Sequence, residues 1–395
     1  MKHVPVPTHV ERRFAPTALM LGNIVTGCSV LAPAGMLGEL ASDLNVTIRD
    51  AALLVTFGAI MLCIGSPVTA WLTSRIDRRT LLAATIAVLA LTNIASAFAP
   101  DYASLLAIRL VMLAVGALYT PQAAGTAALI VPVEKRGSTI AYIFLGWSLA
   151  AAAGLPLITL IASGFGWRAV YGSIGLIGCI SFVLLAWRLP GGLVGAPVDL
   201  KTWAAVGRNR TIVLLLAITT LQMSGQFVVF TFMAPLLAKL TQAGPDAIAL
   251  VFLLYGVFGF VGIAIATRIV DSWGAYKTSL LFTAVMLAGV TGWAFSAGIY
   301  PLMACSVAIW GLGFASTNSM QQVRLVGAAP ELASASVSLN TSVLYIGQAL
   351  GSAIGAVLFG RELLYAAGYV GMAFIALALV VVILTRPRRV PTPSI

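Results

Sequence analysis

Residues 363–385 read LLYAAGYVGMAFIALALVVVILT, and residues 386–389, which follow directly, read RPRR. The first stretch contains no Asp, Glu, Lys, Arg or His. A helix needs about 20 apolar residues to cross the hydrocarbon core of a bilayer, and Lys and Arg next to such a helix favour its cytoplasmic end. The segment therefore predicts a membrane-spanning helix that ends in the cytoplasm.

The whole chain has the same character. Of its 395 residues, 60% are hydrophobic and 9% are charged, whereas a soluble domain carries about 25% charged residues. So few charged residues cannot cover a water-facing globule. The composition excludes secreted disulfide scaffolds, nucleic-acid binders, disordered proteins and cytosolic enzymes, and it makes the lipid bilayer the solvent of most of the surface.

Apolar stretches between charges and Pro or Gly breaks predict twelve spans. The first is too long for a cleaved signal peptide and lacks a small-residue cleavage site after it. The predicted fold is an all-α membrane protein with 12 transmembrane helices. The spans are 16–38, 50–73, 80–99, 103–130, 138–161, 168–188, 211–237, 247–269, 278–297, 301–323, 333–359 and 363–385.

The positive charges are distributed unequally between the two sides of this topology. Of the 23 Lys and Arg residues, Arg109 falls inside a span and four fall in the loops of one side: Arg49, Arg168, Lys239 and Arg361. All others fall on the opposite side, which the positive-inside rule assigns to the cytoplasm. Both termini are then cytoplasmic, as an even number of spans requires. The net charge of +11 reflects topology rather than nucleic-acid binding.

The chain divides into two similar parts. A shift of 197 residues places Ser74 on Asp271, Gly116 on Gly313 and Glu134 on Glu331. The longest polar interruption lies between the sixth and seventh spans. We predict two six-helix pseudo-repeats, an N-terminal bundle at 1–188 and a C-terminal bundle at 211–395, joined by a cytoplasmic linker at 189–210. Repeats of this kind are typical of transporters that rock one half against the other around a central site.

The loop between spans 2 and 3, residues 70–79, reads AWLTSRIDRR. It resembles the G-x-x-x-D-R-x-G-R-R loop of the major facilitator superfamily, with Ala70, Ser74 and Asp77 at the positions of the first Gly, the Asp and the second Gly. A cluster of stop-transfer charges is the simpler interpretation of this loop. The resemblance implies that the charges latch the cytoplasmic ends of the halves together in the outward-open state. The residues concerned are Arg75, Asp77, Arg78 and Arg79, with Asp271 and Gly274 in the second copy.

Two further segments carry the resemblance along the chain. Residues 146–157, GWSLAAAAGLPL, resemble the small-residue face of the family's helix 5, which ends in Gly154-Leu-Pro156. Small residues let helices approach closely, and Pro156 bends its helix, so we assign both residues to the conformational change. Residues 338–340, Ser-Leu-Asn, resemble helix 11 of the bacterial drug and sugar efflux branch.

Arg109 lies inside the fourth span and is similar to the Arg that the family carries there, followed by the small residue Gly116. It is about 12 Å inward from Asp101 at 1.5 Å per residue, where a guanidinium is costly unless it faces water or a partner. A snorkelling Arg is the alternative. We favour a functional Arg that faces a cavity.

Polar side chains inside spans are expected to face the interior of the bundle. They concentrate on helices 1, 4, 7, 10 and 11, and the resemblance implies a cavity lined by helices 1, 4, 7 and 10. A hydrogen bond between helices is the alternative role for any one of them. The predicted solute-binding residues are Asn23, Thr26, Arg109, Tyr119, Gln122, Gln222, Gln226, Asn318, Asn340, Tyr345 and Gln348.

Several kinds of site are not expected. The four Cys residues lie in apolar runs without metal-ligand spacing, and both His residues lie near the N-terminus, so we predict no metal and no cofactor. The absence of a P-loop excludes ATP as the driver. No carboxylate lies at mid-depth in a span, and Val30 stands where efflux relatives often have Glu. An uncharged polar or anionic solute therefore fits better than a cation, and proton coupling is implied by the resemblance alone.

We therefore predict a secondary transporter, and not an enzyme, in the bacterial inner membrane. It would move a small organic solute, such as a drug, sugar or metabolite, by alternating access and proton-coupled efflux. Its partners are the solute, the bilayer and protons, with no nucleic acid, and we expect a monomer. A facilitator or uptake symporter is the alternative on the same fold. A membrane enzyme would need convergent catalytic groups, which the spans lack; a scaffold would not explain polar groups in both repeats.

Overall fold

The computed structural model describes residues 9–73, 75–132, 136–193, 200–329 and 332–386. Within these ranges the regular elements are helices, and no strand is present. Eleven of the described helices are long and apolar enough to cross a membrane. One of them, α13, runs from Pro245 to Phe295 and is interrupted at Gly274, whose φ of 78° is not helical. Because α13 therefore holds two spans, the prediction of twelve is confirmed.

The N half contains the first six spans. Two of these are built from consecutive pieces: α5 continues into α6, and α7 continues through a π-helical turn, η2, into α8. The elements are α1 (His9–Gly35), α2 (Leu37–Asp43), α3 (Ile48–Leu72), α4 (Arg78–Ala97), α5 (Tyr102–Gly116), α6 (Tyr119–Ile130), α7 (Arg136–Leu149), η2 (Ala150–Gly154), α8 (Leu155–Phe165) and α9 (Trp167–Arg188).

The C half contains the other six, preceded by a short helix within the predicted linker. Its elements are α10 (Leu200–Arg208), α11 (Arg210–Phe230), α12 (Met233–Thr241), α13, α14 (Tyr300–Ala328), α15 (Ala333–Gly360) and α16 (Ala366–Leu384). Asn209 joins the linker helix α10 to α11. Its N–H donates to the Val206 carbonyl at 3.1 Å, and its side chain caps α11 by accepting from the N–H groups of Thr211 and Ile212.

The predicted duplication is visible in the helix boundaries. Helix α3 begins at Ile48 and α13 at Pro245, 197 residues later; α7 begins at Arg136 and α15 at Ala333, again 197 residues later. The short helices α2 and α12 follow the first span of each half and are equivalent members of the two repeats. The predicted spans 1 (16–38) and 7 (211–237) ran on without a break into the first residues of these two helices. The chain instead breaks before each of them, at Met36 and at residues 231–232.

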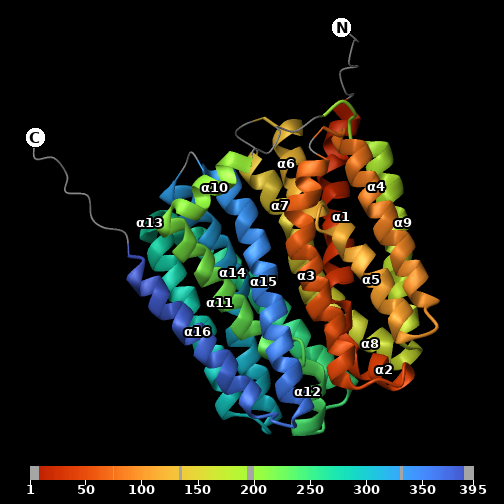
Figure 1. Cartoon of the computed structure of the whole chain (residues 1–395), viewed down its shortest axis with the longest axis vertical. Coiled ribbons are helices and arrows are strands. Elements are labelled where there is room, and N and C mark those ends of the chain that lie inside the picture. Colours follow the sequence, from red (N-terminus) through yellow and green to blue (C-terminus); the bar gives the residue numbers. More distant parts are fainter. Residues whose placement is uncertain (1–8, 74, 133–135, 194–199, 330–331, 387–395) are drawn as a thin grey trace, which may run out of the picture.

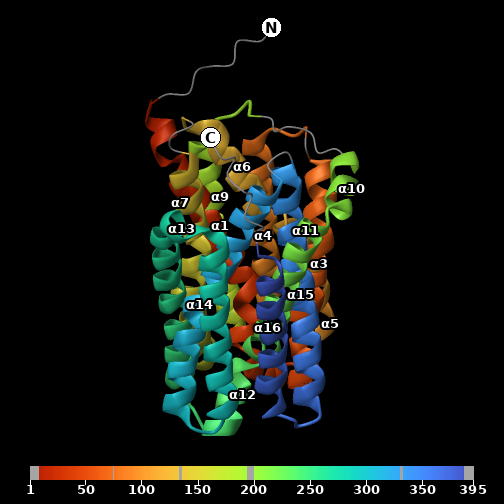
Figure 2. The same cartoon turned by 90° about the vertical axis from the view of Figure 1, so that its left-hand side faces the viewer.

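The two short helices define one end of the molecule. In Figure 1, α2 and α12 lie beside each other at the lower end, and residues of the two helices are in contact. Helix α10 lies at the opposite end, toward which α1 begins and α16 finishes, and Figure 2 shows the same arrangement from the side. The described chain therefore begins and ends at the same end of the bundle, the end that carries α10. That this end is cytoplasmic remains a prediction from the charge distribution.

Close packing within the C half depends on a stripe of glycines on α15. A methyl group added at Gly347, Gly351 or Gly355 would lie 2.5, 2.3 or 2.6 Å from a carbonyl oxygen of α11. Because the glycines are spaced four apart, they form one face of the helix, and the backbones of α11 and α15 touch along it. Small residues at such contacts are how membrane helices gain packing energy.

The first contact between the two halves is made where α8 and η2 meet α13. Pro156 has no N–H to donate to the Ala152 carbonyl. The helix before it widens into the π-helical turn η2, in which the N–H of Leu155 donates to the Ala150 carbonyl. This turn places Ala152 against Gly256 of α13, so that a methyl group on Gly256 would lie 2.1 Å from the Ala152 Cα.

The second contact between the halves joins α3 to α15. The Thr56 hydroxyl donates to the Ser352 hydroxyl at 2.9 Å, and nearer to the α2–α12 end the Arg49 side chain covers Gly360. Together with the contact of α2 with α12, these interactions close the molecule at that end.

Candidate functional site: two polar networks and a closed gate

A polar network ties α1 to the two helices beside it in the N half. The Asn23 Nδ2 donates to the Ile143 carbonyl at 3.0 Å, and its Oδ1 accepts from the Thr120 hydroxyl at 2.8 Å. The Trp147 indole N–H donates to the same hydroxyl at 3.0 Å. Asn23 is fully buried, whereas Thr120 and Trp147 are partly exposed. The exposed members of this network, Thr120 and Trp147, are therefore the ones that a solute could contact.

Arg109 is buried, and main-chain carbonyls take up its guanidinium. Its Nε donates to Leu54 at 2.7 Å, Nη1 to Ser29 at 3.0 Å and Nη2 to Val30 at 2.9 Å. The Ser29 carbonyl is available because the residue four positions on is Pro33, which has no N–H. Arg109 thus satisfies a carbonyl left open by a proline and joins α1, α3 and α5. The sequence led us to expect an Arg that faces a cavity. In this conformation Arg109 is instead buried, and its guanidinium donates to these three carbonyls.

Two other predicted residues of the N half are also enclosed. Tyr119 is fully buried; its ring lies against Gly22 and its hydroxyl donates to the Leu19 carbonyl at 3.1 Å. The Thr26 hydroxyl donates to the Gly22 carbonyl of its own helix at 2.8 Å. Both side chains pack α1 against its neighbours and present no free polar group to a solute.

In the C half, Gln226 is the centre of an aromatic cluster. Its Oε1 accepts from the Trp310 indole at 3.0 Å and from the Tyr255 hydroxyl at 3.4 Å. Phe230 packs on both rings, with centroids 6.4 and 5.0 Å away, and Phe314 lies 5.1 Å from Tyr255. Because Gln226, Tyr255 and Trp310 are buried, the amide orients the aromatic rings.

The remaining amides of the C half fall into two groups. Gln222 donates to the Thr283 hydroxyl at 2.9 Å and so turns toward the second part of α13, away from Gln226. Asn340 accepts from Thr219 at 2.7 Å and donates to Asn318 at 3.2 Å, which links α11, α15 and α14. Asn340 is fully buried and Asn318 is partly exposed.

Tyr345 and Gln348 differ from the other predicted residues. Neither side chain has a hydrogen-bond partner among the described residues, and the polar atoms of neither are completely enclosed by protein. They share a face of α15 with Ser352, whose hydroxyl bonds across to Thr56 of the N half. These two side chains therefore offer unused hydrogen-bonding groups beside the junction of the halves.

The charged loop between α3 and α4 is bound within the N half. Asp77 accepts from the Thr80 N–H at 3.1 Å, capping α4, and from the Leu193 N–H at 3.0 Å. Arg78 donates to the Gln122 side-chain oxygen, so this oxygen is already engaged within the N half, and Arg79 donates to the Ala186 carbonyl. Arg75 is exposed. Among the described residues the predicted latch between the halves is therefore not formed in this conformation, which is closed at the other end.

The equivalent loop of the C half uses glycine instead of a cap. Gly274 corresponds to Asp77 in the repeat and has a φ of 78°, which only glycine adopts without strain. Asp271 beside it is exposed. In the fifth span, Gly154 of η2 packs against the Cys28 sulfur, and Pro156 of α8 follows the π-helical turn that touches α13. The assignment of these residues to a conformational change stays a prediction.

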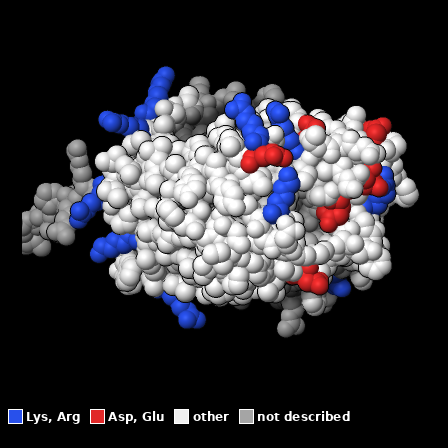
Figure 3. Space-filling view, turned by 90° about the horizontal axis from the view of Figure 1, so that it is seen from below, with Lys and Arg blue, Asp and Glu red and all other residues white. Residues whose placement is uncertain are grey.

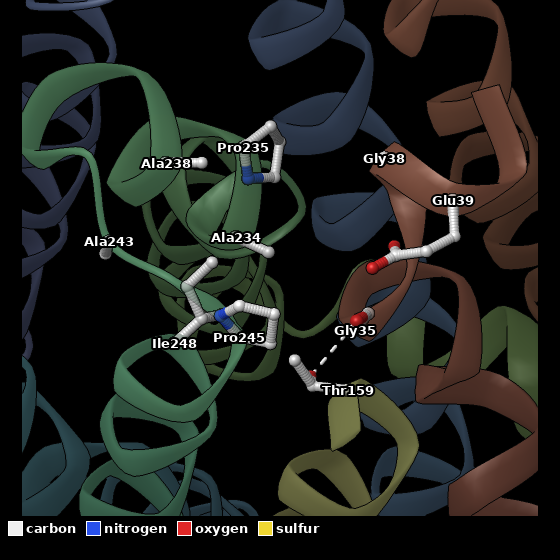
Figure 4. Close-up of a pocket in the computed structure, with 10 residues that line it drawn as sticks. All are labelled: Gly35, Gly38, Glu39, Thr159, Ala234, Pro235, Ala238, Ala243, Pro245 and Ile248. Carbon is white, nitrogen blue, oxygen red and sulfur yellow. Dashed lines mark hydrogen bonds between the residues drawn. The ribbon is translucent and has the colours of Figure 1, made fainter. Parts of the chain in front are cut away.

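A crevice lies between the halves at the α2–α12 end. Its volume is about 210 Å³, and its lining is apolar apart from Glu39 and Thr159. Figure 4 shows the Glu39 carboxyl directed into it from α2, with Ala234, Pro235 and Ala238 of α12 opposite. Thr159 donates to the Gly35 carbonyl at 3.0 Å. Sequence inspection placed Glu39 at the end of span 1 but not against the other half.

Acidic side chains gather over the N-half side of this end of the molecule (Figure 3). Hydrogen bonds from Trp167 and then Arg168 lower the pKa of Asp43, whereas burial raises the pKa of Glu39 against a smaller effect of its own backbone N–H. No group of three or more His, Cys, Asp or Glu that could hold a metal ion occurs in the described part of the chain.

The networks were only partly foreseeable. The sequence indicated Asn23, Asn318, Asn340, Tyr345 and Gln348, but not their partners. It did not single out Thr56 and Ser352 between the halves, the aromatic residues Trp147, Tyr255 and Trp310, or Gly256. The four-residue spacing of Gly347, Gly351 and Gly355 was the available signal for close helix packing. Thr56 and Ser352 could have been noticed as hydroxyl residues inside otherwise apolar spans.

The chain is similar to proteins of known family over almost its whole length. The model of the Major Facilitator Superfamily matches residues 19–352. The inner membrane transport protein YdhP of Escherichia coli K12 is 29% identical over 95% of this chain and 96% of its own. A probable sugar efflux transporter of Mannheimia succiniciproducens is 25% identical over 88% and 87%. The crystal structure of a D-xylose–proton symporter has a TM-score of 0.76 at 15% identity, over 95% of this chain and 98% of that one.

Proposed function

The chain belongs to the major facilitator superfamily, and we propose that it exports a small, neutral, hydrogen-bonding organic solute in exchange for protons. It is a multi-pass membrane transporter of small solutes rather than an enzyme. Alternating access would expose one site first to the α10 end and then to the α2–α12 end. The positive-inside charge distribution supports a cytoplasmic α10 end, and we propose that the chain lies in a bacterial inner membrane.

The free hydrogen-bonding groups of Tyr345 and Gln348 carry this proposal. Buried polar groups are nearly always paired, and most polar side chains described above are. Two groups one turn apart that have no partner among the described residues, on the helix that bonds across to Thr56, are therefore suited to bind a solute at the junction of the halves. Asn318 and the pair Thr120–Trp147 would complete the site from the C and N halves.

A neutral solute fits this site better than a charged one. The guanidinium of Arg109 is taken up by three carbonyls, so it offers little to an anion. A cation would lack a carboxylate, because none of the described residues places one away from the ends of a candidate span. Hydroxyl, amide and indole groups suit a hydroxyl-rich molecule, and the printed name of one relative is a probable sugar efflux transporter.

The same lack of an interior carboxylate favours a second candidate function. A proton-coupled exporter needs a group that titrates during the cycle, and such groups usually lie inside the spans. A facilitator needs none, and it would carry the solute down its own gradient through the same conformations.

We expect the double change Tyr345→Phe and Gln348→Leu to lower solute transport by about tenfold or more while folding is retained. Each change removes only hydrogen-bonding groups, and the loss of about 1–1.5 kcal/mol per bond to the solute corresponds to about tenfold in affinity. Thr92→Val is the matched control, because Thr92 bonds to the carbonyls of its own helix. Equal transport by the double variant and the control would contradict this site.

The experiment is transport by the purified chain in liposomes that contain a pH-sensitive dye. A proton gradient is imposed and sugars, nucleosides, phenicols, organic acids and lipophilic cations are tested in turn. Collapse of the gradient that depends on a sugar or nucleoside is the expected result. Solute movement that leaves the dye unchanged would identify a facilitator, and movement of cations alone would contradict the proposed solute class.

A further inference from the structure

Glu39 stands at the place where the halves meet at the closed end. Its side chain enters the crevice from α2, and the opposite wall is formed by Ala234, Pro235 and Ala238 of α12 and by Ala243, Pro245 and Ile248 of α13 (Figure 4). A carboxyl from one half thus faces an apolar wall that belongs to the other half. Separation of the halves at this end would remove that wall and expose the carboxyl to water.

No positive charge in the described part of the chain compensates Glu39. The elements that surround it are α1, α2, α3, α8, α12 and α13. The described parts of α1 from Phe14 onward and of α8 contain no charged residue. The charged groups of the others are engaged elsewhere or exposed. Asp43 pairs with Arg168, Arg49 covers Gly360, Asp50 accepts from Thr47, Lys239 lies over the Phe359 ring, and Asp246 is exposed.

The duplicated unit supplies an independent comparison. The repeat offset of 197 residues places Leu236 of α12 at the position of Glu39 in α2. Leu236 is buried, 1% exposed. The same position of the same fold is therefore filled by an apolar residue in one half and by a carboxyl in the other. A residue that departs from what its environment favours marks a functional position more often than a packing position.

Glu39 also has access to solvent from outside the crevice. Gly38, Glu39, Ser42 and Asp43 line a separate hollow on the surface of the α2–α12 end. The carboxyl therefore lies between the outer solution and the interior of the closed gate, so that it can exchange a proton without opening of the halves.

We propose that Glu39 is the proton-binding site of the α2–α12 gate: a proton on its carboxyl allows the halves to close there, and loss of the proton favours opening. Closing partly buries the carboxyl against apolar residues, which costs more for the charged form than for the neutral form. The raised pKa of Glu39 has the matching sign, since burial disfavours the carboxylate. The closed state therefore gains stability as the pH falls and loses it as the pH rises through the pKa of the closed state.

This inference rests on the proposed alternating access and identifies where protons enter it. A proton from the side of the α2–α12 end would close that end and turn the solute site toward the α10 end. For export this is the step that resets the transporter. Because Glu39 exchanges its proton with the solution at the α2–α12 end, the site makes this step depend on pH and does not itself carry a proton across the membrane.

The test measures the distance across the gate as a function of pH. Gly164 of α8 and Gly244 before α13 lie on opposite halves; both are exposed, and an added side chain meets no atom within 4 Å. Spin labels are attached to Gly164→Cys and Gly244→Cys in the full chain, with the four native Cys replaced, in lipid nanodiscs. Distances are recorded between about pH 5 and about pH 8, with and without a transported solute.

We expect the separated population to grow with pH, by about tenfold in the open-to-closed ratio for each unit by which the pKa of Glu39 differs between the two states. Glu39→Gln and Glu39→Leu should stay closed throughout, the second because it installs the residue of the other repeat. Asp246→Asn, a neutralised carboxyl at the same end, should behave as the unmodified chain. Transport by Glu39→Gln should lose its dependence on pH.

A gate that responds to solute but not to pH would overturn the role of Glu39 and leave alternating access intact. So would a Glu39→Gln gate that keeps the pH response of the unmodified chain. A distance that neither solute nor pH changes, in any variant, would overturn both the Glu39 site and the proposed function.

Discussion

The substitution Gly256→Ala is expected to abolish most transport although the chain still folds. The added methyl group would lie 2.1 Å from the Cα and 2.4 Å from the N of Ala152, both backbone atoms of the other half. Since neither atom belongs to a flexible side chain, the halves must move apart. Overpacking of this kind costs about 1–3 kcal/mol, which shifts the closed-to-open ratio at the α2–α12 end by about fivefold to more than a hundredfold.

The matched control for this change is Gly259→Ala, one turn along the same helix. There the nearest atom to the added methyl group is the Gly311 carbonyl oxygen at 3.5 Å, an ordinary contact within the C half. Transport in liposomes and thermal unfolding are measured for both variants. Loss of transport in the Gly256 variant with a melting temperature near that of the control is the expected result. Full transport in the Gly256 variant would show that this contact does not matter for closing.

The substitution Arg109→Met is expected to destabilise the N half by about 2–4 kcal/mol. It removes the donor for the Ser29 carbonyl, which Pro33 leaves without a helical N–H. An unsatisfied buried carbonyl costs about 1–3 kcal/mol. Because Met is shorter than Arg, it also loses packing contacts with α1 and α3. Thermal unfolding in detergent reports the change. Unaltered stability of the Arg109 variant would contradict this account of the residue.

A second substitution separates this explanation from a general loss of packing. Pro33→Ala supplies an N–H for the Ser29 carbonyl, so it should recover part of the stability lost in Arg109→Met. We expect a favourable coupling of about 1 kcal/mol between the two positions in a double-mutant cycle. Simple addition of the two effects would mean that the guanidinium and the proline act independently.

The spans and the duplication followed from the sequence because they depend on patterns along one helix. Lipid as solvent requires long apolar helices, so segments such as 363–385 could hardly fold otherwise. The offset of 197 residues appeared both in single residues such as Gly116 and Gly313 and in the helix starts of the structure. The helix break at Gly274 was also predicted, as the limit between spans 8 and 9.

The partners of polar side chains could not be predicted, since they depend on which face of a helix meets which neighbour. Gln222 and Gln226 are one turn apart, yet one bonds to Thr283 and the other to Trp310. Arg109 was expected to face a cavity because the cost of its burial was estimated without the carbonyl that Pro33 releases. Only the packed helices bring that carbonyl within 3.0 Å of the guanidinium.

Glu39 shows a third limit. In sequence it is an acidic residue at the end of an apolar segment, where contact with water is the simplest expectation. The break of the helix at Met36 starts α2 in a new direction, and only this turn brings the carboxyl against α12 and α13. The repeat offset pairs Glu39 with Leu236, which is the sequence signal that would have indicated an apolar environment.

Counterflow in proteoliposomes tests the central claim, alternating access of one solute site, most directly. Vesicles are loaded with an excess of unlabelled solute, and entry of the labelled solute is followed without any proton gradient. A single site exposed to each side in turn predicts a transient accumulation of label above its outside concentration, which the double variant of Tyr345 and Gln348 should lose. Simple equilibration of the label, unaffected by unlabelled solute inside, would contradict alternating access.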